Sequence, residues 1–499
     1  MTTPATGRSL DRSMARAVAW NATARWASQL LSWVSIIIVA RRLSPADYGL
    51  VGMAGLYLNL ALLISQAGIG ETIIALRDLT RRQIAELNTV AILLGLALVG
   101  LSCALAVPLA RFFSTPALVG VILVSSGMYV MNAFQIVPKA LLQRDLRFKL
   151  LALIDTVRVF SQILITVLLV FLNFGYWSLV AGYMMSALTG SAMTYFWRPH
   201  GFAVPNFRQL GRELKFSRAV LLSNISWYTY NNADFGVAGR VLGEVPLGNY
   251  TVAWTISSAP VEKIANLIAN VTPSFFSALQ SDKAELRRYL IRLTEILSLV
   301  TMPASIGIVL TADYLVPVLL GPKWFGVIGP LRLLGVFVVV RAISTILPNL
   351  LIAIGDASFV MWNSICAAII MPIAFFMGSR WGTIGIAAAW VIAYPLITFP
   401  TCYRVMKKTG LSWKEYGSAV APALSGSSMM VGVVLAARFL LRLQPHSVVP
   451  LSLLVAAGAA SYAGGLMAFH RERVVNIIKT TRSMLSRSEV RDSGSGPTV

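Results

Sequence analysis

The sequence is poor in charge, cysteine and histidine. Of its 499 residues only 12% are charged and 57% are hydrophobic, whereas about a quarter of a soluble domain is charged. Three cysteines without a CxxC pair and three scattered histidines provide neither a disulfide framework nor a metal site. The sequence contains no GxxxxGK[ST], HExxH or GxSxG motif, so we expect no nucleotide-driven pump, no catalytic residues and no cofactor. These absences exclude a soluble enzyme and favour a polytopic membrane protein.

Acidic residues are also scarce, 20 against 42 Lys and Arg, which leaves a net charge of +22. Most basic residues gather in alternate loops between apolar runs, for example at 139–149 and after Arg471. With a cytoplasmic N-terminus, this distribution is the positive-inside pattern. We therefore expect a multi-pass protein of the bacterial inner membrane with both termini in the cytoplasm. The positive charge would then contact anionic membrane lipids and not nucleic acid.

Apolar runs of about 20 residues predict membrane-spanning helices. The runs lie at 18–40, 47–70, 85–110, 117–138, 150–172, 176–197, 217–239, 249–274, 290–312, 328–352, 360–379, 383–403, 418–437 and 447–469. We therefore predict an all-α membrane protein of about fourteen transmembrane helices.

The longest internal loop predicts the domain organisation, because it separates six apolar runs from the rest. The predicted parts are a cytoplasmic N-terminus (1–17), a six-helix lobe (18–197), a cytoplasmic linker (198–216), a second six-helix lobe (217–403), two extra membrane helices (418–469) and a basic, disordered cytoplasmic tail (470–499). A weak repeat supports two parallel halves. "ARRLSPADYGLV" and "AGRVLGEVPLGNYTV" follow the first and seventh runs, with Arg42 and Gly49 matching Arg240 and Gly248 except for one residue of spacing.

Polar residues form stripes at helical spacing on several of these runs. The predicted cavity residues are Asn21, Arg25 and Ser28 on the first run, Asn231 and Asp234 on the seventh, Lys263, Asn266 and Asn270 on the eighth, and Arg341 on the tenth. A cation inside a membrane helix is costly unless it faces water, a counter-charge or an anionic ligand. The surplus of cations predicts a hydrated cavity for an anionic substrate, with phosphate a natural match for Arg and Lys. Asp234 is either a counter-ion to one of the cations or a proton or sodium site.

Two further polar groups have a structural interpretation. Asp155 and Arg158 are three residues apart on one predicted helix and can pair with each other. Ser125, Tyr129 and Asn132 share one face of the fourth predicted helix.

Several segments resemble the polysaccharide exporter family, the Wzx-type flippases of the multidrug/oligosaccharidyl-lipid/polysaccharide (MOP) superfamily, in its colanic-acid-exporter-like branch. They include "LALLISQAGIGETIIALRDLTRRQIAELNTV" (60–90), "ALLQRDLRFKLLALID" (140–155) and "NADFGVAGRVLGEVPLGNYTVAW" (232–254). The resemblance covers about residues 15–410. It implies a V-shaped, two-lobed transporter that works by alternating access. It also implies that the two extra helices shelter the lipid tail.

The resemblance further implies a substrate, an undecaprenyl-pyrophosphate-linked oligosaccharide repeat unit that is flipped to the outer leaflet for exopolysaccharide, capsule or O-antigen synthesis. In related lipid flippases, cations on the helices that correspond to those of Arg25 and Lys263 face the pyrophosphate. Besides membrane lipids, the resemblance suggests the polysaccharide polymerase machinery as a partner.

Three alternatives remain open at this point. A cation-coupled drug antiporter of the same superfamily needs an acidic cavity, whereas the intrahelical acids here are few. The second alternative is a flippase for the peptidoglycan lipid precursor. The signature segments of this sequence look more like those of the exporter branch, but the spacing of the segments does not exclude such a flippase. A membrane polymerase or ligase carries a long external loop, and all predicted external loops here are short.

Overall fold

A computed structural model describes residues 31–66, 68–76, 78–206, 221, 225, 227–259, 276, 282–441 and 447–473. The described residues form helices, turns and loops and contain no strand. The chain divides into two compact units, residues 1–251 and 252–499. Helix is present in the described part of each of the apolar runs, as the hydropathy pattern predicts.

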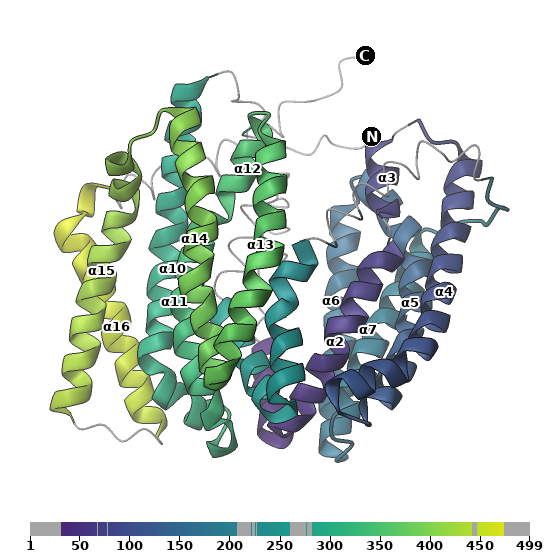
Figure 1. Cartoon of the computed structure of the whole chain (residues 1–499), viewed down its shortest axis with the longest axis horizontal. Coiled ribbons are helices and arrows are strands. Elements are labelled where there is room, and N and C mark those ends of the chain that lie inside the picture. Colours follow the sequence, from purple (N-terminus) through teal and green to yellow (C-terminus); the bar gives the residue numbers. More distant parts are fainter. Residues whose placement is uncertain are drawn as a thin grey trace, which may run out of the picture. The chain divides into compact units, whose positions relative to one another are not determined.

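The first unit is a bundle of long helices coloured from purple through blue to teal in Figure 1. Residues 31–42 are helical, and the later part of the unit has helix at 227–237 and from 244 onward, joined by the π-helix η1 (Ala238–Leu242). The helices between these are α2 (Pro45–Gln66), α3 (Ile69–Ala75), α4 (Arg81–Phe113), α5 (Leu118–Arg144), α6 (Phe148–Phe171) and α7 (Trp177–Trp197).

The second unit is a second helical bundle, coloured teal through green to yellow in Figure 1. Its helices are α10 (Lys283–Leu319), α11 (Ile328–Ser344), α12 (Ile346–Ala353), α13 (Ala357–Gly378), α14 (Gly382–Thr409), α15 (Trp413–Leu440) and α16 (Val448–Phe469), with short 3-10 turns η2 (Pro322–Val327) and η3 (Ser379–Trp381). Both predicted extra helices, α15 and α16, pack against α10.

The helices suit a bilayer in length and surface. Within the described residues, nine stretches are long and apolar enough to cross a membrane. The 37 residues of α10 span about 55 Å at 1.5 Å per residue, well beyond a hydrocarbon core of about 30 Å. Large apolar side chains such as Ile373, Leu396 and Phe399 are more than half exposed. In a membrane they face hydrocarbon, so their exposure carries no penalty.

Local sequence signals set several helix starts. Thr80 and Gln83 form a capping box at α4, and Ser412 and Glu415 form one at α15. Asp282 caps α10 by accepting from two backbone N–H groups. Each of these caps lies before the predicted apolar run, so the helices begin several residues earlier than the hydropathy predicts.

The boundary between the units falls after Thr251 and not in the predicted linker. The reason is that the helices around η1 pack against α2: Tyr228 Oη donates to the Leu56 carbonyl at 2.9 Å. The two six-helix lobes stay a prediction.

Candidate functional site

The predicted cavity residues divide into three sets. Asp234 and Asn231 lie in the first unit and Arg341 lies in the second. The remaining residues lie outside the described part of the chain, and their cavity role stays a prediction: Asn21, Arg25, Ser28, Lys263, Asn266 and Asn270.

Asp234 lies in the interior of the first unit with 0% of its surface exposed. Its Oδ2 accepts a 2.7 Å hydrogen bond from the hydroxyl of Tyr250, which is also 0% exposed. The Tyr250 ring packs edge-on against Phe235. Burying a carboxylate costs several kcal/mol unless hydrogen bonds or charges compensate. The short bond from Tyr250 is one such compensation, and the sequence stripes did not indicate it because Tyr250 lies on the next helix.

Asn231 is also buried, but its Nδ2 donates at 2.9 Å to the Trp227 carbonyl one turn earlier. Asn231 and Asp234 therefore lie on one helix, both buried in the first unit, and their role in a cavity stays a prediction.

Arg341 lies in the second unit beside an aromatic cluster. Its guanidinium carbon lies 5.4 Å from the centre of the Trp254 ring, and Trp254 packs in turn against Phe337 and Trp390. The structure records no ion pair for Arg341 among the described residues. A cation over an aromatic face keeps donors available for an anion.

Two turns of the first unit contact each other closely. They are the first turns of α2 and of the helix from 244, and each carries one glycine of the predicted repeat. A Cβ on Gly49 would overlap the carbonyl of Glu244, and a Cβ on Gly248 would overlap the carbonyl of Pro45. The two contacts are reciprocal. Pro45, which Gly248 contacts, lies four residues before Gly49, and Glu244, which Gly49 contacts, lies four residues before Gly248. The weak sequence repeat is therefore a structural repeat, with reciprocal backbone contacts.

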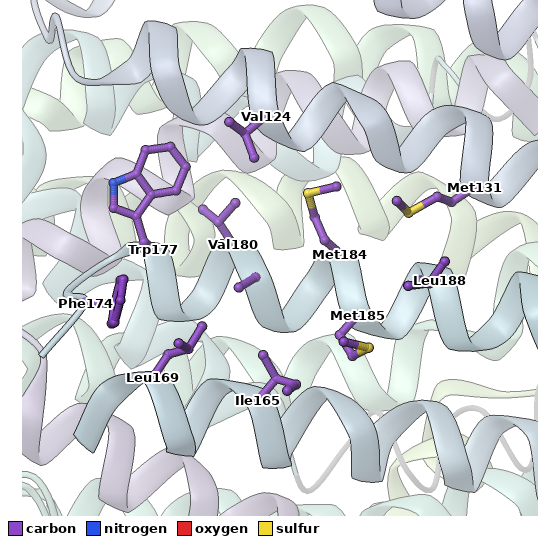
Figure 2. A pocket seen from close by; sticks show the side chains of 11 residues that line it. Val124, Met131, Ile165, Leu169, Phe174, Trp177, Val180, Met184, Met185 and Leu188 are labelled. Carbon is purple, nitrogen blue, oxygen red and sulfur yellow. The ribbon is translucent and has the colours of Figure 1, made fainter. Parts of the chain in front are cut away.

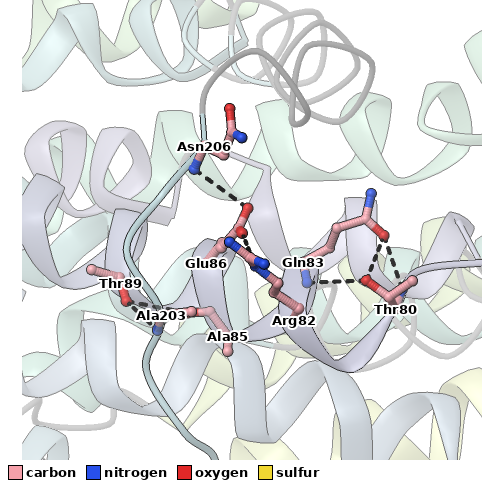
Figure 3. Close-up of polar contacts among 8 residues, drawn as sticks. All are labelled: Thr80, Arg82, Gln83, Ala85, Glu86, Thr89, Ala203 and Asn206. Atoms are coloured by element: carbon pink, nitrogen blue, oxygen red, sulfur yellow. Dashed lines mark hydrogen bonds and ion pairs between the residues drawn. The ribbon is translucent and has the colours of Figure 1, made fainter.

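Glu86 of α4 fixes the start of the predicted linker (Figure 3). Fully buried, it pairs with Arg82 at 3.1 Å and accepts from the Asn206 backbone N–H at 3.4 Å. Thr89 Oγ1 accepts from the Ala203 N–H at 3.2 Å. These bonds fix residues 203–206 on α4, so this acid has a structural role.

An apolar groove of about 650 Å³ lies in the first unit, with α7 between α5 and α6 (Figure 2). Its lining includes Trp177 and Phe174 near the start of α7 and the flexible side chains of Met131, Met184 and Met185. No charged side chain lines it. Such a surface suits hydrocarbon and cannot compensate a phosphate.

Asp313 of α10 is the centre of an ion cluster that the sequence did not reveal. Arg332 of α11 bonds to it, and Arg438 of α15 donates to it at 2.9 Å. Asp313 and Arg438 each lie one residue beyond a predicted membrane run. The sequence could have indicated this pair, because the two residues follow the ends of two predicted membrane helices and would lie at a similar depth in the membrane. Arg287 and Glu415 pair at 2.8 Å near the other end of α15. The extra helix is therefore held to α10 by ion pairs near both ends.

The fold is similar to that of solved membrane transporters. Its structure matches that of a lipid II flippase, MurJ, in an inward-closed conformation, with a TM-score of 0.74 over 91% of this chain and 100% of the other at 13% identity. It also matches a multidrug-resistance MATE family transporter of the MOP superfamily, with a TM-score of 0.62 over 77% and 96% of the chains at 16% identity. At these identities the likeness concerns the fold alone: this is the fold of MOP-superfamily membrane transporters.

The sequence relatives are proteins of polysaccharide biosynthesis. The chain is 24% identical over 407 residues to the lipopolysaccharide biosynthesis protein WzxC of Escherichia coli, covering 80% of this chain and 82% of the relative. It is 25% identical over 500 residues to the succinoglycan biosynthesis transport protein ExoT of Rhizobium meliloti, covering 95% of each.

A family profile described as "Polysaccharide biosynthesis protein" matches residues 38–329, more than half of the chain. The chain belongs to this polysaccharide biosynthesis protein family. The predicted resemblance to the polysaccharide exporters is confirmed.

Proposed function

We propose that the protein is a flippase that moves undecaprenyl-pyrophosphate-linked oligosaccharide repeat units from the cytoplasmic to the outer leaflet of the inner membrane. The observation that carries the proposal is the family match over residues 38–329 in a chain with a transporter fold. Relatives named for lipopolysaccharide and succinoglycan biosynthesis support the assignment to saccharide export. Both termini would lie in the cytoplasm, because the basic loops then lie on that side, and the polysaccharide polymerase machinery would act on the flipped unit.

The cations would offset the charge of the pyrophosphate inside the bilayer. Arg25, Lys263 and Arg341 are the candidates, with Asn21, Ser28, Asn266 and Asn270 as hydrogen-bonding groups beside them. Guanidinium and ammonium groups form charge-assisted hydrogen bonds with phosphate oxygens. Arg341 supports this role because its described neighbour is an aromatic ring and not a carboxylate.

Asp234 is the candidate for ion coupling. Tyr250 donates to it at 2.7 Å while the acid is ionised. A protonated Asp234 could instead donate to the same hydroxyl, so the pair can hold or release a proton without losing its contact. A proton bound there would neutralise a charge whose movement across the membrane costs about 2.3 kcal/mol per 100 mV.

The drug antiporter is the alternative that a transport assay must exclude. Within the described residues, the fully buried acids are Glu86 and Asp234. Glu86 already pairs with Arg82 and accepts a hydrogen bond from the Asn206 backbone. Of these two acids, Asp234 therefore remains to bind a cationic substrate. A peptidoglycan-precursor flippase is the other alternative, supported by the fold of MurJ alone.

The test is flipping in liposomes that contain the full chain, with a fluorescent undecaprenyl-pyrophosphate oligosaccharide. We expect transport by the wild type, loss of transport in Arg25→Gln, and normal transport in Arg111→Gln, a matched change at the exposed end of α4. Transport of a cationic dye, with none of the lipid-linked saccharide, would support the antiporter. Preference for lipid II over other lipid-linked saccharides would support the peptidoglycan precursor.

A further inference from the structure

Three helices of the first unit bring polar side chains together at Gly190 of α7. A Cβ built on Gly190 would lie 2.8 Å from Cδ and Nε of Arg158 on α6 and 2.8 Å from Oε1 of Gln135 on α5. Gly190 therefore provides the space in which these two side chains approach each other. Ser161 of α6 and Thr189 of α7 share a 3.0 Å hydrogen bond nearby, which joins the two helices.

Arg158 is poorly compensated for a cation inside a membrane helix. Its predicted pairing with Asp155 is confirmed, but the separation of Nη1 and Oδ1 is 3.7 Å and Asp155 is 58% exposed. Its Nε is buried and has no hydrogen-bond partner. Arginine has five N–H donors and cannot be deprotonated in a protein. A guanidinium with unfilled donors at this depth is expensive, and such residues mark functional sites in membrane proteins.

Gln135 presents an acceptor at the same place. Asn132 Nδ2 donates to the Met128 carbonyl at 2.8 Å, which fixes the orientation of that amide. Asn132 Oδ1 then accepts from Gln135 Nε2, which leaves Gln135 Oε1 directed away from Asn132. This Oε1 is buried and has no partner. An unfilled donor and an unfilled acceptor therefore lie together, and a group with anionic oxygens and a neighbouring hydroxyl would satisfy both.

We propose that Arg158 and Gln135 form a second anion subsite, in the first unit, for an acidic group of the transported lipid-linked saccharide. The inference rests on the proposed function and extends it to residues outside the predicted cavity set. The shared chemistry is an oxyanion beside a hydroxyl, which a sugar phosphate and a sugar acid both offer. In this view Asp155 orients Arg158 or competes with the substrate for it, and does not contact the substrate.

Binding by the purified full chain in detergent tests the subsite without transport, with inorganic pyrophosphate and D-glucuronate as probes. We expect Arg158→Gln to weaken binding of at least one probe about tenfold or more, and Arg158→Lys to weaken it less. Loss for pyrophosphate alone identifies the carrier phosphate as the source, and loss for glucuronate alone identifies the sugar. Asp155→Asn separates the two roles of Arg158. If Arg158 serves only the ion pair, Asp155→Asn and Arg158→Gln should behave alike, whereas the subsite predicts unchanged or tighter binding in Asp155→Asn.

Gly190→Ala provides a second test that keeps the charge of Arg158. The three atoms nearest to the new methyl belong to the flexible side chains of Arg158 and Gln135, so these side chains should move, the helices should still pack and the subsite should be lost. Gly100→Ala in α4 is the matched control, because nothing lies within 4 Å of its added Cβ. Equal membrane levels and elution profiles confirm that the variants fold.

Unchanged affinity for both probes in Arg158→Gln, or no binding of either probe by the wild type, would overturn the subsite. Flipping then distinguishes the two proposals. Normal flipping of the lipid-linked saccharide by Arg158→Gln rejects the subsite and leaves the flippase in place. Absence of flipping by the wild type, together with Arg158-dependent binding, rejects the flippase assignment and retains the anion site.

Discussion

Two turns of the first unit have the same backbone arrangement and different chemistry around them. Gly49 packs on the carbonyl of Glu244, and Gly248 packs on that of Pro45, so the two contacts are related by exchange of the halves. Before each turn, an arginine lies over a phenylalanine ring, Arg42 over Phe171 and Arg240 over Phe112. The extra residue that weakens the sequence match is accommodated in η1, where a π-helix holds one more residue than an α-helix of the same length.

The difference lies in the helices on either side of the turns. Asp234 lies six residues before Arg240, at the position of Ile36 before Arg42. Tyr250 lies two residues after Gly248, at the position of Val51 after Gly49. The buried acid and its hydroxyl donor are therefore present on one side alone. The two halves thus share a backbone contact but differ in charge. This difference is required if only one half carries an ion-coupling group.

The glycine contacts should give the largest effect. Gly49→Ala or Gly248→Ala places a methyl group on a backbone carbonyl that cannot rotate away, so the turns must separate. We expect a loss of about 2–3 kcal/mol in the free energy of unfolding and a strong loss of flipping, measured on the purified chain and in liposomes. Gly55→Ala on the same helix is the control, because its Cβ would lie at an ordinary 3.6 Å from Asn59 Nδ2. Equal stability of all three variants would contradict the close contact.

Tyr250→Phe should give an intermediate effect and sharpen the chemical difference between the halves. The ring remains against Phe235, but Asp234 loses a donor, which should cost about 1–3 kcal/mol of unfolding free energy. Tyr57→Phe is the comparison, because it removes a hydroxyl from a neutral partner, Ser102, at 2.8 Å. A smaller loss in Tyr250→Phe than in Tyr57→Phe would show that Asp234 is not ionised beside Tyr250.

Loss of the ion pair between Asp356 and Arg404, which lies outside both turns, should have the smallest effect on stability. The hydrogen bond from Arg404 lowers the pKa of Asp356, in the turn before α13, below its usual value. Because the folded-state pKa is depressed, its stabilisation is present above the unfolded value of about 3.9 and is lost as pH falls through the folded value. Asp356→Asn should therefore lower the melting temperature by about 1–2 °C at pH 7 and by progressively less below about pH 4. A difference that grows on acidification would contradict this sign.

Hydropathy located the membrane helices because a segment in hydrocarbon must satisfy its own backbone hydrogen bonds, and that requirement acts within one segment. Asn231 and Asp234 are both buried, since residues at helical spacing share a face, and their cavity role stays a prediction. The partner of Asp234 was not predictable, because Tyr250 approaches it only after the chain reverses at Gly243. For the same reason Asp313 and Arg438, 125 residues apart, did not look like a pair.

The sequence by itself determined a multi-pass helical membrane protein, its family and the identity of its intramembrane charges. These properties depend on composition and on spacing within single helices. The tertiary structure decided which charges are compensated and which are not. It placed Asp234 against Tyr250, Asp313 between two arginines, and Arg158 beside an unfilled acceptor at Gly190. Those outcomes depend on approach distances between helices, which small residues and turns set and which no single segment encodes.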